Sequence, residues 1–195
     1  MSHLYLIGTG PGGLEHLSPA ARAALESCTD LAGHGLYLNL LGELTEGKIR
    51  HKTPMGEELA RATLALDLAA SGRTTALISS GDAGIYGMAT VVFELLARKP
   101  KPEWSDVEIE VIPGISAMQA AAARVGAPLA HDFCVISLSD LLTPWELIAK
   151  RIDLAGQGDF AIAFYNAVSN KRSWQLLEAR QILLRYRQPE TPVVV

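Results

Sequence analysis

The chain has 195 residues, 49% of them hydrophobic, and a formal net charge of −4, enough apolar material for one sizeable core or two small ones. The sequence has no long cluster of Lys and Arg, so we expect no nucleic-acid partner. No apolar run reaches the ~18 residues of a membrane span and the N-terminal residues show no signal-peptide pattern, so we expect no membrane partner. Cys28 and Cys134 stand alone without CxxC spacing and the histidines show no metal-ligand spacing, which favours a cytoplasmic protein with reduced thiols and no metal.

The first predicted element is a short buried strand, Leu4-Tyr5-Leu6-Ile7, followed by the glycine-rich loop Gly8-Thr9-Gly10-Pro11-Gly12-Gly13. The loop matches the G-x-G-x-x-G fingerprint of dinucleotide-binding proteins, with Asp30 roughly twenty residues on. We reject that interpretation because the helix signal comes later, with Ser18 as N-cap and Pro19 at the first helical position. The loop is still predicted to form a glycine-rich surface at the carboxyl end of a strand.

The next elements alternate between helices and strands. In order, the predicted ranges are helix 19–27, strand 30–32, helix 34–41, strand 48–52 and helix 57–70. The last helix is followed by Ser71-Gly72, which is a C-cap signal.

The stretch with the most chemistry is Ser79-Ser80-Gly81-Asp82-Ala83-Gly84-Ile85-Tyr86-Gly87-Met88, between an apolar strand, 74–78, and a helix with apolar residues at 91, 92, 95 and 96. Its three glycines allow close approach to a ligand or a positive φ. Asp82 follows a predicted parallel strand at its carboxyl end, where open α/β sheets bind their ligands. The structural alternative is that Asp82 only caps the next helix.

A second candidate loop follows the alternating strand 107–112 and reads Pro113-Gly114-Ile115-Ser116-Ala117. Ser116 is predicted to cap the alanine-rich helix 118–125 and to leave its first amides facing the same cleft as the preceding loop. The alternative is a simple strand-to-helix turn. This turn is also the predicted domain boundary, which gives an N-terminal α/β domain at 1–113 and a C-terminal α/β domain at 114–195.

The second half repeats the α/β rhythm. The predicted elements are strand 131–137, a helix opened by the capping box Thr143-Pro144-Trp145-Glu146, strand 159–165 ending in Asn166, helix 174–186 and strand 191–195. An exposed valine strand at a terminus invites edge pairing, so we expect the natural product to be longer or the chain to have been cut.

With these residues in view, the chain resembles the tetrapyrrole methylase family over nearly its full length. The family's markers occur in order, each at a strand end: Gly8-Thr9-Gly10-Pro11-Gly12, Ser80-Gly81-Asp82, Pro113-Gly114-Ile115-Ser116-Ala117 and Phe164-Tyr165-Asn166. Within the family, the segment Leu138-Ser139-Asp140-Leu141-Leu142-Thr143-Pro144-Trp145, with Ser169 and Arg172, resembles the members that methylate ring carbon 17 of precorrin-3B or cobalt-factor III, with ring contraction, in cobalamin biosynthesis.

The resemblance implies two α/β domains with S-adenosylmethionine in the cleft between them, a tetrapyrrole substrate and a homodimer. It implies cofactor contacts, by matching position, at Pro11, Ser80, Gly81, Asp82, Ile85, Ser116, Ala117 and Asn166. It implies that Gly10 contacts the substrate, whose carboxylates need a local basic rim, with candidates Lys48, Arg50, Lys52, Lys171 and Arg172. The candidates for proton movement during ring contraction are His34, Tyr37 and Asp82, and the alternative for a lone histidine is a structural role.

Methyl transfer from a sulfonium to a carbon nucleophile requires neither a metal nor a protein nucleophile, so the protein's main task is positioning. Three alternatives remain open at this point. One is another methyltransferase of the same fold, such as a diphthine synthase or a ribosomal RNA methyltransferase, although the latter would need a basic face. The second is an inactive cofactor-binding fragment, suggested by the abrupt C-terminus, and the third is an NAD oxidoreductase.

Overall fold

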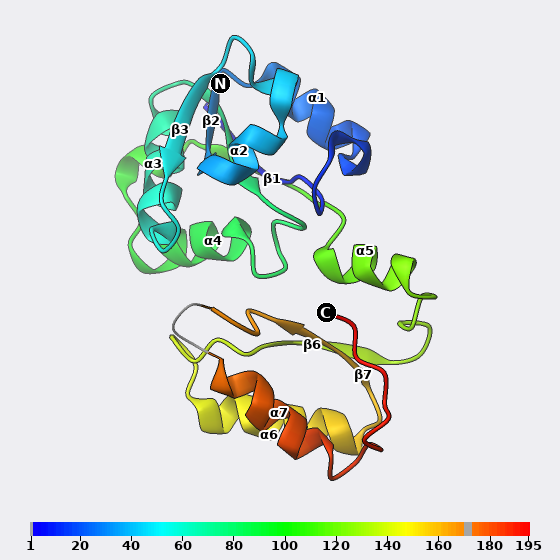
Figure 1. The fold of residues 1–195 in the computed structure, drawn as a ribbon. Helices are drawn as coiled ribbons and strands as arrows, with labels where there is room; N and C mark the ends of the chain where they lie inside the picture. Colours follow the sequence, from blue (N-terminus) through cyan, green and yellow to red (C-terminus); the bar gives the residue numbers. More distant parts are fainter. Residues whose placement is uncertain (1, 170–172) are drawn as a thin grey trace. The chain divides into compact units, whose positions relative to one another are not determined.

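A computed structural model describes residues 2–169 and 173–195 of the chain (Figure 1). It contains two compact units, Met1–Ala120 and Ala121–Val195, which are described separately. The division falls within helix α5 (Ala117–Arg124), whereas the predicted domain boundary lies earlier, in the turn that precedes this helix. No helix in the described ranges is long and apolar enough to cross a membrane.

Unit 1 is built on a parallel five-stranded sheet with the order β3-β2-β4-β1-β5. The strands are β1 (His3–Gly8), β2 (Asp30–His34), β3 (Ile49–Thr53), β4 (Thr74–Ser79) and β5 (Glu108–Ile112). Each lies within a few residues of its predicted range. The parallel arrangement inferred for the strand before Asp82 is confirmed.

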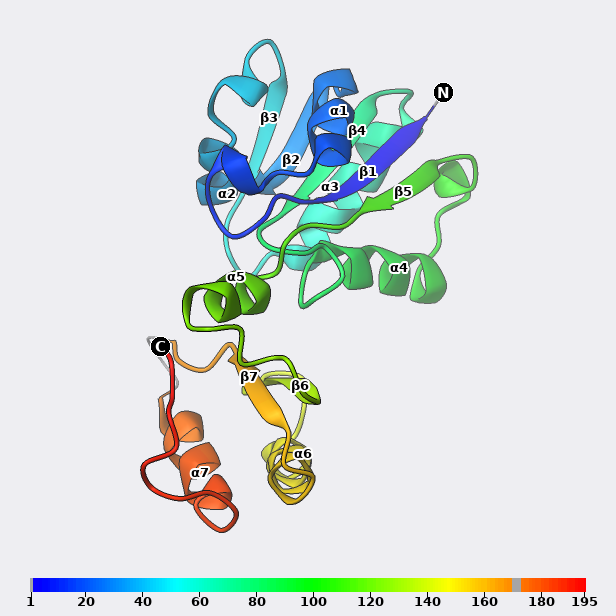
Figure 2. The ribbon, with the colours of Figure 1, turned by 90° about the vertical axis from the view of Figure 1, so that its right-hand side faces the viewer.

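Helices cover both faces of this sheet (Figures 1 and 2). They are α1 (Pro19–Ser27), α2 (Gly35–Leu40), α3 (Glu58–Ala70) and α4 (Met88–Arg98), with short 3-10 turns η1 (Leu14–His16), η2 (Gly42–Thr45) and η3 (Pro102–Trp104). Because successive strand residues point to opposite faces, Leu77 joins the core under α3 and α4, while Ile78 joins the core under α1 and α2.

The helix boundaries of unit 1 have the local causes that the sequence predicted. The Ser18 hydroxyl accepts a hydrogen bond from the Ala21 N–H at 3.1 Å, and Pro19 is the first residue of α1. This late start separates the glycine loop from the helix and supports our rejection of a dinucleotide fingerprint. At the end of α3, Gly72 has a φ of +89°, and the N–H groups of Gly72 and Arg73 bond back to the last turn as in a Schellman motif.

Unit 2 contains the parallel pair β6 (Phe133–Ser137) and β7 (Ala161–Tyr165), with α6 (Trp145–Gln157) and α7 (Trp174–Leu183). Its buried core is small, and its members are Ile136, Leu138, Ile148, Ile152, Ala155 and Ala179.

Two predictions for this half were wrong. The capping box at the start of α6 does not form, because Pro144 is itself the N-cap residue, with an extended ψ of 140°, and the helix has no side-chain cap. Residues 191–195 form no strand, since no strand among the described residues pairs with them, and Val193, Val194 and Val195 are exposed.

Candidate active site at the carboxyl ends of β1, β4 and β5

The sheet of unit 1 has its topological switch between β1 and β4. From β1 the chain crosses through α1 to β2 on one side, whereas from β4 it crosses through α4 to β5 on the other. Open α/β sheets bind ligands outside the carboxyl ends of the strands at such a point. The loops that follow β1 and β4 are the two glycine-rich stretches identified in the sequence.

Backbone segments from three loops approach one another more closely than side chains would allow. A Cβ atom on Gly114 would lie 2.2 Å from the carbonyl oxygen of Gly81 and 2.6 Å from the backbone of Gly8. A Cβ atom on Gly8 would lie 2.7 Å from both Gly81 and Gly114. Glycine is therefore required at Gly8 and Gly114 by the space available, and the three loops form one continuous backbone surface.

The loops after β1 and β4 are also hydrogen-bonded to each other. Gly10 and Gly81 exchange backbone hydrogen bonds, with N···O distances of 3.0 and 2.7 Å. Their φ angles are +80° and +66°, which residues with a Cβ rarely adopt. The predicted positive φ is confirmed at Gly81, and the backbone is fixed here without any side chain.

Two buried hydroxyl residues that the sequence did not single out hold the same region together. The N–H and the hydroxyl of Thr9 both donate to the Ser79 carbonyl, at 2.9 and 3.0 Å. The Ser79 hydroxyl accepts from the N–H of Met88, the first residue of α4, at 3.0 Å. The only sequence signal for a role of Thr9 and Ser79 was that both lie inside the glycine motifs. Nothing in the sequence shows that their hydroxyls point inward.

The Asp82 carboxylate joins the loop after β4 to the loop after β5. One oxygen accepts from the Gly84 N–H at 2.8 Å and the other from the Gly114 N–H at 2.9 Å. The interpretation of Asp82 as the cap of the next helix is wrong, since the N-cap of α4 is Gly87 and the first N–H of α4 bonds to the Ser79 hydroxyl. Each carboxylate oxygen has a second lone pair, so Asp82 retains acceptor capacity toward a ligand.

Ser116 caps α5 as predicted. Its hydroxyl accepts from the Gln119 N–H at 3.3 Å, and the Gln119 side chain accepts from the Ser116 N–H at 2.9 Å, which is a reciprocal capping box. Ser116 is buried, and the next residue, Ala117, is exposed at the first position of the helix.

The other predicted cofactor residues of unit 1 lie in the same loops. Pro11 follows Gly10 and is half-buried, Ser80 is exposed directly after β4, and Ile85 is half-buried farther along that loop. Asn166 lies in unit 2, at the end of β7, with a φ of 52°, and its amide donates to the Ser137 hydroxyl at 3.0 Å. Its placement near the other candidates stays a prediction.

His34 and Tyr37 lie at the carboxyl end of β2. His34 is the N-cap of α2, and its Nδ1 accepts from the Leu36 N–H at 3.3 Å. That bond places the proton of the neutral ring on Nε2. The rings of His34 and Tyr37 meet edge to face, with centroids 5.4 Å apart. His34 thus has a structural role, and Nε2 stays available for a proton transfer.

The basic candidates are distributed along β3. Lys48 donates to the carbonyls of Cys28 and Glu26, at 2.8 and 3.2 Å, and so braces the amino end of the sheet. Arg50 donates to the Asn39 side chain. Lys52 is exposed near the carboxyl end, next to Gly35 of α2. Lys171 and Arg172 lie outside the described residues.

An open hollow lies along α4 and β5 and adjoins the glycine loops only at Gly84. We do not assign it to the cofactor because its walls are otherwise formed by Ala89, Thr90, Phe93, Glu94, Ala97 and Val111.

At the opposite, amino end of the sheet, Asp30 forms a closed ionic cluster. The carboxylate is fully buried and accepts from His51 at 2.7 Å, Arg73 at 2.6 Å and the Thr29 hydroxyl at 2.7 Å. Burial raises the pKa of Asp30, but the hydrogen bonds from His51, Arg73 and Thr29 outweigh it, so the net pKa lies below its ordinary value. Nearby, burial raises the pKa of the free Cys28 thiol to about 11, which keeps it protonated at neutral pH.

Comparison with known proteins decides the family. The family model of tetrapyrrole (corrin/porphyrin) methylases matches residues 3–195. The chain belongs to this family. The tetrapyrrole methylase fold expected from the four glycine-containing and aromatic motifs is confirmed, and the NAD oxidoreductase alternative falls.

Two of the proteins similar to this chain are named as methyltransferases of precorrin-3B or cobalt-factor III. The chain is 44% identical over 191 residues to the precorrin-3B C(17)-methyltransferase of Sinorhizobium sp, which covers 98% of this chain and 74% of the relative. It is 46% identical over 192 residues to the probable cobalt-factor III C(17)-methyltransferase of Salmonella typhimurium, with coverages of 98% and 78%. The crystal structure of the methyltransferase CobJ superposes with a TM-score of 0.89 at 44% identity, over 95% of this chain and 77% of that one.

The chain matches only part of some longer relatives. It is 50% identical over 190 residues to the cobalt-factor III methyltransferase of Priestia megaterium, which is 97% of this chain but 35% of that protein. The chain therefore spans about a third of the length of that relative.

Proposed function

We propose that this chain is an S-adenosylmethionine-dependent methyltransferase that acts at ring carbon 17 of precorrin-3B or cobalt-factor III. The observation that carries the proposal is the backbone surface formed by Gly8, Gly81 and Gly114 at the switch point of the sheet. The relatives whose names state this reaction support it, at 44% and 46% identity.

The residues at this edge fit the proposed cofactor. The cofactor supplies an electrophilic methyl group, and the chain must hold it close to backbone atoms. Pro11, Gly81, Asp82 and Ser116 lie in the three loops that would contact it. Because a Cβ at Gly114 would collide with Gly81, the close backbone approach is built into the loops rather than induced by a ligand.

The chain's own contribution is mainly orientation, which lowers barriers by roughly 7–11 kcal/mol in well-aligned systems. We assign His34 Nε2 and the Tyr37 hydroxyl to the proton movement that ring contraction needs, since both lie at the carboxyl edge. Asp82 acts in this proposal by fixing Gly84 and Gly114 and by accepting from the cofactor with its remaining lone pairs.

The remaining parts of the proposal concern substrate contacts and context. Gly10, Arg50, Lys52 and Arg172 are proposed to contact the tetrapyrrole, and Asn166 to contact the cofactor. A homodimer is proposed from the family resemblance, and a cytoplasmic location is supported by the free thiols of Cys28 and Cys134.

The test is calorimetric titration with S-adenosylhomocysteine, followed by transfer of labelled methyl from S-adenosylmethionine to precorrin-3B and to cobalt-factor III. We expect one cofactor bound per chain and methylation at carbon 17 of at least one substrate. Cofactor binding with methylation of neither substrate would refute the assigned reaction, and no cofactor binding would refute the proposal as a whole.

A further inference from the structure

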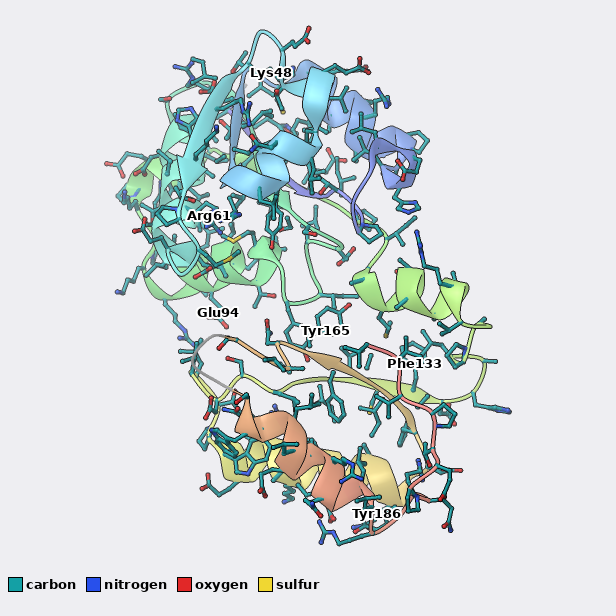
Figure 3. The ribbon with its side chains drawn as sticks, in the orientation of Figure 1. Lys48, Arg61, Glu94, Phe133, Tyr165 and Tyr186 are labelled. Carbon is teal, nitrogen blue, oxygen red and sulfur yellow. The ribbon has the colours of Figure 1, made fainter. Side chains whose placement is uncertain are left out.

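Arg61, in the first turns of α3, carries a positive charge into the interior beside the carboxyl ends of β3 and β4. Its side chain is almost entirely buried, with 3% of the residue exposed. The guanidinium donates to the Thr53 hydroxyl, to the Pro54 carbonyl at 2.6 Å, and to the Met88 sulfur at 3.5 Å. It thus connects the end of β3, α3 and the start of α4 (Figure 3).

All three partners of Arg61 are electrically neutral. No carboxylate among the described residues forms an ion pair with it. The two acids nearest in sequence are Glu57, which is exposed, and Glu58, which accepts from the Gly56 N–H at 3.0 Å. The charge is therefore buried without a countercharge in the described chain.

Such an arrangement is unfavourable in the free protein. Desolvating an ion is costly unless an opposite charge compensates for it, and arginine does not escape by losing its proton. The starts of α3 and α4 lie beside the guanidinium and add positive potential from their helix dipoles. The N-cap residues Glu57 and Gly87 supply no side-chain cap, and the Ser79 hydroxyl that accepts from the first N–H of α4 carries no charge. A ligand with negative charge would offset all three contributions.

The cover over Arg61 is a short exposed segment. Pro54, Met55 and Gly56 are exposed, and Gly56 has a φ of +89°. On the same edge of the sheet lie the exposed Lys52 and the half-buried His34. An anion placed over this segment would feel the Arg61 charge through few atoms of low-dielectric protein, where charge interactions are stronger than in water.

We propose that the carboxyl edge beside Thr53, Pro54 and Met88 binds a carboxylate of the substrate, and that the buried charge of Arg61 makes this edge selective for anions. This inference rests on the proposed function for the identity of the substrate, a polycarboxylated tetrapyrrole. Arg61 is a specificity-determining residue in it, acting through charge, while its hydrogen bonds hold the covering segment in place.

The experiment separates charge from structure at this one position. Binding of uroporphyrin, a polycarboxylated porphyrin, is measured by fluorescence quenching for the unmodified chain and for Arg61→Lys and Arg61→Met. Melting temperatures are recorded in parallel. Arg73→Met is the matched control, because Arg73 is paired with Asp30 at the other end of the sheet.

Arg61→Met is expected to weaken uroporphyrin binding about tenfold or more, on the scale of a lost interaction between charged groups. Arg61→Lys keeps the positive charge but not the forked set of guanidinium N–H donors, and its affinity for uroporphyrin is expected to stay within about threefold of that of the unmodified chain. Arg73→Met should lower the melting temperature and leave porphyrin binding unchanged. The affinity lost in Arg61→Met should shrink as salt is added, since added ions screen charge.

Two results would overturn the inference. One is Arg61→Met binding uroporphyrin as well as the unmodified chain does. The other is an equal loss of affinity in the Lys and Met variants together with a lowered melting temperature, which would make Arg61 a structural brace. The porphyrin assay needs no cofactor. A chain that binds no S-adenosylhomocysteine would therefore refute the proposed methyltransferase, while the comparison of porphyrin binding by the Arg61 variants would still test this inference.

Discussion

At the amino ends of the strands in unit 1, the buried carboxylate of Asp30 is paired with the Arg73 guanidinium and is also hydrogen-bonded to His51 and Thr29. At the carboxyl ends, the buried guanidinium of Arg61 has only neutral partners in the described chain. Both groups are charged and inaccessible to water, but only the first has a countercharge among the residues that the structure describes. Folding alone thus compensates the buried charge at the amino end. At the carboxyl end, the buried positive charge has no countercharge among the described residues, which is why we propose that an anion binds there.

The two ends of the sheet also differ in whether side chains or main-chain atoms connect the strands and loops. The amino end is joined by side chains that reach across strands, such as Lys48 to the carbonyls of Glu26 and Cys28. The carboxyl end is joined by main-chain contacts between Gly8, Gly81 and Gly114, which leave no room for a Cβ at Gly8 or Gly114. Removing side chains from a surface exposes backbone donors and acceptors to a ligand. Substitutions at the two ends should therefore separate stability from binding.

The largest effect on binding is expected for Gly114→Ala. The added Cβ would lie 2.2 Å from the Gly81 oxygen, so the loops after β4 and β5 must move apart. We expect affinity for S-adenosylhomocysteine to fall by about 100-fold or more, roughly 2.7 kcal/mol, in calorimetry. The free energy of unfolding should fall by about 1–3 kcal/mol, as for other overpacked sites.

The control for this variant is Gly35→Ala, where the nearest neighbour of the new Cβ is the Lys52 Cδ at 3.8 Å. It should bind the cofactor product normally. Unchanged affinity in Gly114→Ala would show that the close approach of the loops does not serve the cofactor.

Asp30→Asn probes the amino end. Removing the charge leaves Arg73 and His51 without their partner, and we expect a loss of roughly 3 kcal/mol in the free energy of unfolding, at the low end for buried pairs because Arg73 and His51 are partly exposed. Urea denaturation measures this loss. Affinity for S-adenosylhomocysteine should stay within about twofold. A variant that keeps its stability but no longer binds S-adenosylhomocysteine would contradict our assignment of stability to the amino end and of binding to the carboxyl end.

Asp82→Asn tests the connection between the two loops at the carboxyl end. Asn keeps one acceptor oxygen but places an NH2 group against the N–H of either Gly84 or Gly114. We expect affinity for S-adenosylhomocysteine to fall about tenfold, the equivalent of 1.4 kcal/mol, and unfolding to become easier by about 1 kcal/mol. Asp106→Asn, at an exposed position, is the matched control.

An Asp82→Asn variant that matches Asp106→Asn in both measurements would show that neither N–H needs a carboxylate. The amide signals of Gly84 and Gly114 in NMR spectra give a direct check, since both should shift together in Asp82→Asn.

The smallest effect is the pH dependence of stability contributed by Asp30. Its pKa in the folded chain lies below the ordinary value of about 3.9, so the folded state favours the charged form. The stabilisation is fully present above about pH 4 and is lost as the pH falls through the folded pKa. Urea midpoints of the unmodified chain and of Asp30→Asn, measured between pH 7 and pH 2.5, should therefore come closer together as the pH falls. A constant difference across that range would contradict this linkage.

Short-range signals were sufficient for most of the elements. Ser18 before Pro19, and Gly72 after α3, fix helix ends through bonds to residues within a few positions, so local sequence predicts them. The same applies to Ser116, whose partner Gln119 is three residues away. Thr143 and Pro144 show the limit of such signals, because the sequence pattern of a capping box does not say which residue adopts the cap conformation.

The glycine motifs and Asp82 were recognisable from the sequence, and so was the carboxyl-edge location, since it follows from a strand that ends in a glycine loop. The sequence also predicted the alternation of strands and helices, because apolar periodicity is a local property. Family membership followed from the order of the motifs along the chain and is confirmed by the match over residues 3–195.

Only the tertiary structure decided what the Asp82 oxygens bind and which glycines are sterically required. Gly114 lies against the Asp82 carboxylate and the Gly81 carbonyl because β4 and β5 are the two neighbours of β1 in the sheet, an order that no local pattern encodes. The difference between Arg61 and Arg73 arose in the same way. Both are arginines near the ends of α3, and only the packing of distant strands gives Arg73 a carboxylate and leaves Arg61 without one in the described part of the chain.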